Sequence, residues 1–134
     1  MKDAEELTAG NEDPAGSKLE TFATAVCCID GRAQEPVMAF ARARFGAGFV
    51  DMVNKPGAVA TADDALRSAV AISMKAHRSL GIVVSAHSDC AANPVPNETQ
   101  KEQCRALARE LAAEWREVEV VPVWVPIAGE LEVL

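Results

Sequence analysis

The chain has 134 residues and a mass of 14.2 kDa, a length that predicts a single domain. Its 49% hydrophobic and 25% charged residues are typical of a globular protein whose core needs no disulfides. No apolar run approaches the roughly 20 residues that a membrane-spanning helix requires. The net charge of −7 disfavours nucleic acid and anionic membrane surfaces, because both attract positive patches. We therefore expect no nucleic-acid partner and no membrane partner.

The first 20 residues differ in composition from the rest of the chain. They carry −4 of the −7 charge, and Gly10, Pro14 and Gly16 are scattered among the acids. Low hydrophobicity with high charge predicts a flexible acidic arm over residues 1–20 and a folded domain over residues 21–134. The acidic start lacks the apolar core of a secretory signal, so the expected location is cytoplasmic.

Strand and helix patterns alternate through the first half of the predicted domain. The apolar run at residues 21–28 predicts a buried strand. Pro36 fits the first turn of a helix that continues to about Arg44, where Gly46 ends it. Residues 49–53 predict a second strand.

The alternation continues through the second half. Thr61 and Asp64 resemble a capping box and predict the start of a helix. A further helix carries an apolar stripe from Cys104 to Trp115. Apolar runs predict strands over 81–86 and 118–125 and a short edge strand over 131–134. Such alternation predicts a single α/β domain with a mostly parallel sheet of four to five strands flanked by helices.

Reactive side chains follow two of the predicted strands. Ligands of parallel α/β sheets bind beyond the carboxyl ends of the strands, which is where Cys28, His87 and Cys90 fall. Two thiols and an imidazole suit Zn²⁺ in a tetrahedral site. Three protein ligands leave one position for water, as in catalytic zinc sites. We therefore predict Cys28, His87 and Cys90 as zinc ligands.

Charged residues beside the predicted ligands indicate a catalytic pair. Asp30 either accepts a hydrogen bond from a zinc-bound water or coordinates zinc itself and closes the site. Arg32 is expected to hold Asp30 and to keep its carboxylate ionised. Asp89 is a weaker candidate, for orienting the His87 ring or for capping the following turn.

The two predicted ligand loops resemble a known pair of motifs. Cys-Ile-Asp-Gly-Arg at residues 28–32, followed by His-Ser-Asp-Cys at residues 87–90, looks like the zinc signature of the β-class carbonic anhydrases. Residues 46–50, 68–70 and 124–131 are similar to further segments of that family, so the resemblance covers residues 21–134.

The resemblance implies a fold and an activity. It implies a β-carbonic-anhydrase-like sheet and the hydration of carbon dioxide to bicarbonate by a zinc-bound hydroxide. It also implies that Asp30 and Arg32 gate the metal, and that the chain forms a homodimer or a higher homo-oligomer with its site near the subunit interface.

Three other functions remain open at this point. The same site would suit a related heterocumulene such as carbonyl sulfide or carbon disulfide. A non-catalytic zinc-binding subunit is the second alternative, favoured by Gly31 in place of the family's serine and by the lack of the family's arginine in residues 53–57. A cysteine-nucleophile enzyme using Cys28 and His87 ranks last, because the spacing to Arg32 is too short for a phosphatase loop and no Cys-x-x-Cys pair exists.

The two remaining cysteines and His77 are predicted to have structural positions and no catalytic role. Cys27 should point to the opposite face of its strand from Cys28 and lie in the core. Cys104 lies on an apolar helix stripe and is also expected in the core. His77 is expected to be structural or solvent-exposed. Three apolar residues are predicted to form the walls of a pocket for a small linear substrate: Val37, Phe49 and Met52.

Overall fold

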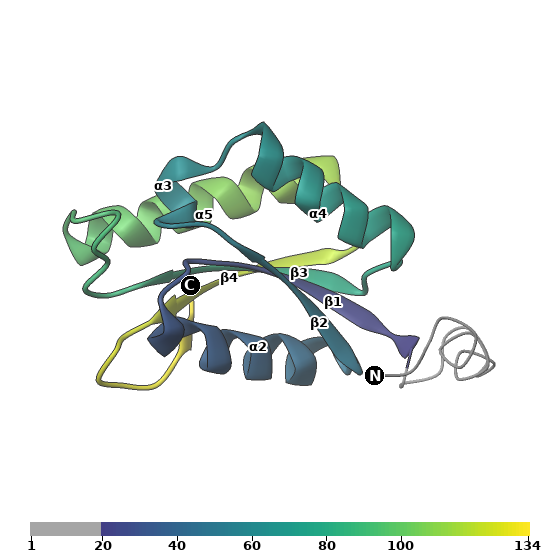
Figure 1. Cartoon of the computed structure of the whole chain (residues 1–134), viewed down its shortest axis with the longest axis horizontal. Coiled ribbons are helices and arrows are strands. Elements are labelled where there is room, and N and C mark those ends of the chain that lie inside the picture. The colour runs from purple at the N-terminus through teal and green to yellow at the C-terminus, as the bar shows by residue number, and fades with distance from the viewer. Residues whose placement is uncertain (1–19) are drawn as a thin grey trace, which may run out of the picture.

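A computed structural model describes residues 20–134 as alternating strands and helices (Figure 1). The elements in chain order are β1 (Phe22–Cys27), α2 (Gly31–Phe45), β2 (Phe49–Asn54), α3 (Ala58–Thr61), α4 (Asp64–Ala76), β3 (Gly81–His87), α5 (Asn97–Glu114), β4 (Glu119–Val125) and β5 (Glu132–Val133). None of the helices in this part of the chain has the length and apolarity needed to cross a membrane.

The strands form one five-stranded sheet in the order β2-β1-β3-β4-β5. The first four strands are parallel, and β5 pairs antiparallel with β4. In Figure 1, α2 covers one face of the sheet, and α3, α4 and α5 cover the other. The predicted fold class, a mostly parallel α/β sheet flanked by helices, is confirmed.

The core consists of two layers, one on each face of the sheet. Ala25 and Cys27 of β1 pack with Val37 of α2 in the first layer. Val26, which alternates with them along β1, packs in the second layer with residues of α4 and α5. Every residue of β3 is buried, as is typical of a central parallel strand. The central strands β1 and β3 are therefore packed against a core layer on each face of the sheet.

The helix α2 begins earlier than the sequence predicts. Its first residue is Gly31, and the preceding Asp30 caps the helix because its Oδ1 accepts the amide N–H of Arg32 at 2.9 Å. Pro36 therefore lies inside the helix and not in its first turn, so the predicted start is wrong. The end is as predicted, since Gly46 adopts a left-handed conformation with φ of 62°.

The predicted capping box at Thr61 is also wrong. Thr61 is the last residue of the short helix α3, and its hydroxyl donates to the carbonyl oxygen of Pro56 at 2.8 Å. The cap of α4 is Asp63, whose Oδ1 accepts the amide N–H of Leu66 at 2.9 Å. Ala62 has an extended backbone that separates the two helices, so Asp63 is the residue at the start of the second one.

The predicted acidic arm at residues 1–20 lies outside the described residues except for Glu20, and it stays a prediction.

Candidate metal centre

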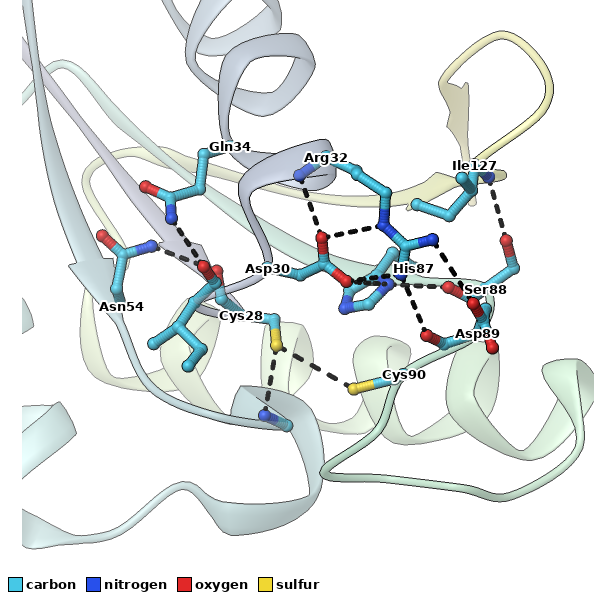
Figure 2. A network of polar contacts seen from close by, with 12 residues as sticks. Cys28, Asp30, Arg32, Gln34, Asn54, His87, Ser88, Asp89, Cys90 and Ile127 are labelled. Atoms are coloured by element: carbon cyan, nitrogen blue, oxygen red, sulfur yellow. Dashed lines mark hydrogen bonds and ion pairs between the residues drawn. The ribbon is translucent and has the colours of Figure 1, made fainter.

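The three predicted ligands meet at the carboxyl ends of two neighbouring strands. Cys28 directly follows β1, and His87 is the last residue of β3, which pairs with β1 in parallel. Cys90 lies three residues further, on the loop that follows β3. Figure 2 shows the three side chains converging from these two loops.

The spacing of the three ligand atoms suits one metal ion. The Sγ atoms of Cys28 and Cys90 are 3.9 Å apart, and all three ligand atoms lie within 4.8 Å of one another. Zinc–sulfur bonds of about 2.3 Å at a tetrahedral angle place two sulfurs about 3.8 Å apart. All three side chains are buried. The group is therefore compact enough to hold a tetrahedral metal.

The His87 ring presents one nitrogen to the group. Its Nδ1 lies 2.7 Å from the carbonyl oxygen of Ser88, a contact in which the ring N–H donates. That tautomer leaves a lone pair on Nε2, which is buried and has no hydrogen-bond partner among the described residues. Buried polar atoms rarely lack a partner, and a histidine that ligates a metal commonly anchors its other nitrogen in this way. The donor set thus fits a metal ion.

The environment of Cys28 favours its ionised form. Partial burial raises the pKa of its thiol, but the amide N–H of Gly57, which donates to Sγ at 3.4 Å, and the nearby His87 outweigh this effect. The pKa of Cys28 therefore lies below its usual value. Burial raises the pKa of Cys90. Cys28 is accordingly the more readily ionised ligand of the two thiols.

The predicted pair of Asp30 and Arg32 is formed. The guanidinium of Arg32 donates through Nε to Oδ1 of Asp30 at 3.0 Å and through Nη2 to Oδ2 at 2.7 Å. These bonds, together with the amide N–H of Arg32, lower the pKa of Asp30 to about 2. Asp30 is therefore ionised at neutral pH, and its Oδ2 lies 3.9 Å from Nδ1 of His87.

Asp89 has neither of the roles suggested for it. Its carboxylate accepts a hydrogen bond from Nη1 of Arg32 at 3.3 Å, and its backbone is left-handed with φ of 55°. The His87 ring is oriented by the carbonyl of Ser88 instead. Arg32 thereby connects the two ligand loops, as Figure 2 shows.

Sequence reasoning missed three residues that hold the loops. Gly57 donates its amide to Cys28, as described above. Asn54 donates its side-chain amide to the carbonyl oxygens of Cys27 at 3.4 Å and Cys28 at 3.2 Å. Ser88 accepts the amide N–H of Ile127 at 2.9 Å. Two sequence signals pointed to Asn54: it follows a predicted strand, and it lies within residues 53–57, which stand in place of a segment of the family.

The two other cysteines lie in the core as predicted. Cys27 packs on the α2 face of the sheet, and burial raises the pKa of its thiol to about 11. Cys104 packs on the opposite face, and burial raises the pKa of its thiol to about 12. Neither thiol belongs to the Cys28–His87–Cys90 group that could hold a metal ion.

The three residues predicted as substrate walls and His77 lie outside the candidate metal centre. Phe49 is the first residue of β2, at the amino edge of the sheet, so its assignment as a wall is wrong. Val37 is fully buried and packs in the α2 core layer, and Met52 packs against that layer. His77 is structural: its Nδ1 lies 2.6 Å from Oδ2 of Asp51.

A mostly parallel sheet with a Cys-His-Cys group across two adjacent strand ends defines an α/β protein with a candidate metal centre at its carboxyl edge. The chain also matches the model of a protein family described as "Putative carbonic anhydrase" over residues 18–134. Because this match covers most of the chain, the protein belongs to that family. No curated protein sequence matches it significantly.

Solved structures of carbonic anhydrases, two of which are described as β-carbonic anhydrases, share the fold. The enzyme of Coccomyxa, solved with acetazolamide, superposes with a TM-score of 0.64 at 14% identity, covering 98% of this chain and 81% of that chain. A tetrameric enzyme of Sordaria macrospora gives 0.62 at 15% identity, covering 90% and 83%. The enzyme of Glaciozyma antarctica gives 0.58 at 18% identity, covering 96% and 92%. At these identities the likeness is one of fold.

Proposed function

We propose that the protein is a zinc-dependent carbonic anhydrase that hydrates carbon dioxide to bicarbonate. The observation that carries this proposal is the buried Nε2 of His87, which has no hydrogen-bond partner within residues 20–134 and lies beside two thiols 3.9 Å apart, in a chain of the carbonic anhydrase family. A group of this composition is suited to zinc.

Cys28, His87 and Cys90 would hold the ion. Zinc, when bound, acts as a Lewis acid that makes a water molecule acidic near neutral pH. The low pKa of Cys28 favours the thiolate that such binding needs. Ser88 fixes the tautomer of His87 that directs the lone pair of Nε2 toward the two sulfurs.

Asp30 and Arg32 would act on the water and not on the metal. Arg32 occupies both carboxylate oxygens of Asp30, which keeps the carboxylate ionised and oriented. Oδ1 also accepts the amide N–H of Arg32, so Oδ2 is the oxygen that retains a lone pair with which to accept a further hydrogen bond. Asp30 is therefore the group assigned to orient water at the site, with Arg32 as its positioning residue.

Stopped-flow hydration of carbon dioxide on protein of known zinc content tests this function. We expect about one zinc per chain and a chelator-sensitive rate well above that of buffer. Asp30→Asn should lower kcat about 10²-fold or more while zinc is retained. Asp64→Asn, at an exposed acid of α4, is the matched control and should leave the rate unchanged.

Two results would count against the proposal. Protein that carries no zinc after preparation with the metal would overturn the metal site. Zinc-loaded protein with only background hydration would overturn carbon dioxide as the substrate, and carbonyl sulfide and carbon disulfide would then be assayed. The cytoplasm remains our proposed location, which fractionation of expressing cells tests.

A further inference from the structure

A cavity of about 600 Å³ lies at the amino edge of the sheet, at the opposite end of the strands from the candidate metal centre. It opens where the end of α4 meets the start of β1 and the residue before β3 (Figure 1). Ligand pockets commonly have volumes of about 300–1,000 Å³. One acid, two basic groups and two large apolar groups line this cavity: Glu20, His77, Arg78, Phe22 and Leu80. It is large enough for a small organic molecule, and the proposed reaction does not use it.

The imidazole of His77 is held in place at the wall of this cavity. Its Nδ1 lies 2.6 Å from Oδ2 of Asp51, and the hydroxyl of Ser73 donates to the same oxygen at 2.7 Å. Ser73 is buried, and its Oγ lies 2.6 Å from Oγ1 of the buried Thr24. The ring also stacks on Phe22, with 4.0 Å between the ring centroids. Because a carboxylate can only accept, Nδ1 carries the proton and Nε2 is the nitrogen left for a ligand.

Two opposite charges and an apolar side chain complete the lining. Neither Glu20 nor Arg78 forms an ion pair within residues 20–134. Arg78 also has a left-handed backbone with φ of 49°, a conformation that strains any residue other than glycine and that clusters at ligand sites. Leu80, which follows two residues later, is 44% exposed. The cavity therefore offers an unpaired negative charge, an unpaired positive charge and exposed apolar surface.

We propose that this cavity binds a small zwitterion with an apolar body, of the class of the α-amino acids with apolar side chains. The guanidinium of Arg78 receives the carboxylate of the ligand, for which its fork of donors is suited. The carboxylate of Glu20 receives the ammonium group, and Nε2 of His77 accepts a hydrogen bond from it. Phe22 and Leu80 contact the apolar body. Binding is reversible, and no covalent bond forms or breaks.

The charges of the lining decide between classes of ligand. A simple carboxylate would meet Glu20 as well as Arg78, and a simple amine would meet Arg78 as well as Glu20, so each would face one like charge. A ligand that carries both charges pairs with both side chains. β1 has six residues at about 3.3 Å each, which places the cavity roughly 17–20 Å from the metal centre. The inference therefore depends neither on the metal nor on the proposed reaction, and their tests fail independently.

Titration calorimetry of the full chain with phenylalanine is the first test. The matched probes are 3-phenylpropionate, which lacks the ammonium group, and 2-phenylethylamine, which lacks the carboxylate. We expect one phenylalanine per chain and at least about 10-fold weaker binding of each analogue, because each leaves one charge of the lining unpaired. The affinity for phenylalanine should be the same with a chelator in the buffer. Binding that disappears with the chelator would assign the ligand to the metal centre and overturn the proposal.

Two variants test the assignment of the charges. Arg78→Gly should bind phenylalanine at least about 10-fold more weakly without weakening 2-phenylethylamine, and its Tm should stay close to that of the unaltered chain because glycine suits the left-handed backbone. Glu20→Gln should weaken phenylalanine to a similar extent without weakening 3-phenylpropionate. Arg42→Gln, at an exposed arginine of α2, is the matched control and should bind like the unaltered chain. The proposal is overturned if phenylalanine does not bind, or if either lining variant binds it with unchanged affinity.

Discussion

At the scale of single residues, Gly57 joins the two ligand loops. Its amide donates to Sγ of Cys28 at 3.4 Å, and its φ of 58° is left-handed. A Cβ at this position would lie 3.0 Å from the carbonyl oxygen of Ala92, two residues after Cys90 on the second ligand loop. Any other residue type would therefore strain the backbone and push the second loop away from the first.

Gly57→Ala should accordingly weaken metal binding. Gly46→Ala is the matched control, because Gly46 also has a left-handed φ, of 62°, but has open space at the position of a Cβ. Backbone strain should cost each variant about 1–2 kcal/mol of unfolding free energy, and the close contact with Ala92 should make the total loss larger for Gly57→Ala. Only Gly57→Ala should also lose metal affinity, by about 10-fold or more in competition with a chelator. Equal affinities in the two variants would show that Gly57 has no role in positioning Cys28.

At the scale of elements, the start of α4 depends on one carboxylate. Asp63 accepts the amide N–H of Leu66 and forms an ion pair with Lys55, which follows β2. The hydrogen bond from Lys55 and then that from Leu66 lower the pKa of Asp63. The cap therefore connects α4 to the segment between β2 and α3.

Asp63→Ala should lower the Tm at neutral pH by about 3–5 °C, and Asp63→Asn, which keeps a capping oxygen, by less. Because the folded pKa of Asp63 is lowered, its ionised form stabilises the fold above the ordinary carboxyl pKa. That stabilisation is lost as the pH falls through the lowered value. The Tm difference from the unaltered protein should therefore shrink in acid. A constant difference from pH 7 to pH 3 would contradict the role of the charge.

The elements show why part of the structure could be predicted. Runs of apolar residues in β1 and β3 determine which segments are central strands, and strand ends determine where ligands gather. Thr61 and Asp63 are both residues that can cap a helix, and only the backbone at Ala62 decides between them. Gly57 acts through its backbone amide, which no side-chain pattern reveals. The cap of α4 and the contact from Gly57 to Cys28 could therefore be identified only from the folded structure.

At the scale of the whole molecule, the metal would connect the two central strands. Cys28 follows β1, while His87 and Cys90 lie at the end of β3, so one ion would cross-link segments far apart in the chain. A ligand that binds only the folded state raises its stability, by about 2.7 kcal/mol at 100 times its dissociation constant. Metal content should therefore control stability as well as activity.

Treatment with a chelator should lower the Tm of the loaded protein by about 5–10 °C, and added zinc should restore it. His87→Ala removes one ligand, so its Tm should no longer respond to the chelator. Calorimetry with and without chelator checks both expectations. An unaltered protein whose Tm ignores the chelator, despite bound zinc, would show that the metal lies outside this group.

The separation of the two ligand loops also has a consequence for biosynthesis. Between them lie β2, α3 and α4, so the Cys-His-Cys group is assembled only after this crossover has folded and β3 has docked against β1. When β1 has emerged from the ribosome and β3 has not, the growing chain exposes Cys28 but neither His87 nor Cys90. Capture of an ion by all three ligands would therefore follow the pairing of β1 with β3, and it would precede or accompany the addition of β4 and β5, which come after Cys90 in the chain.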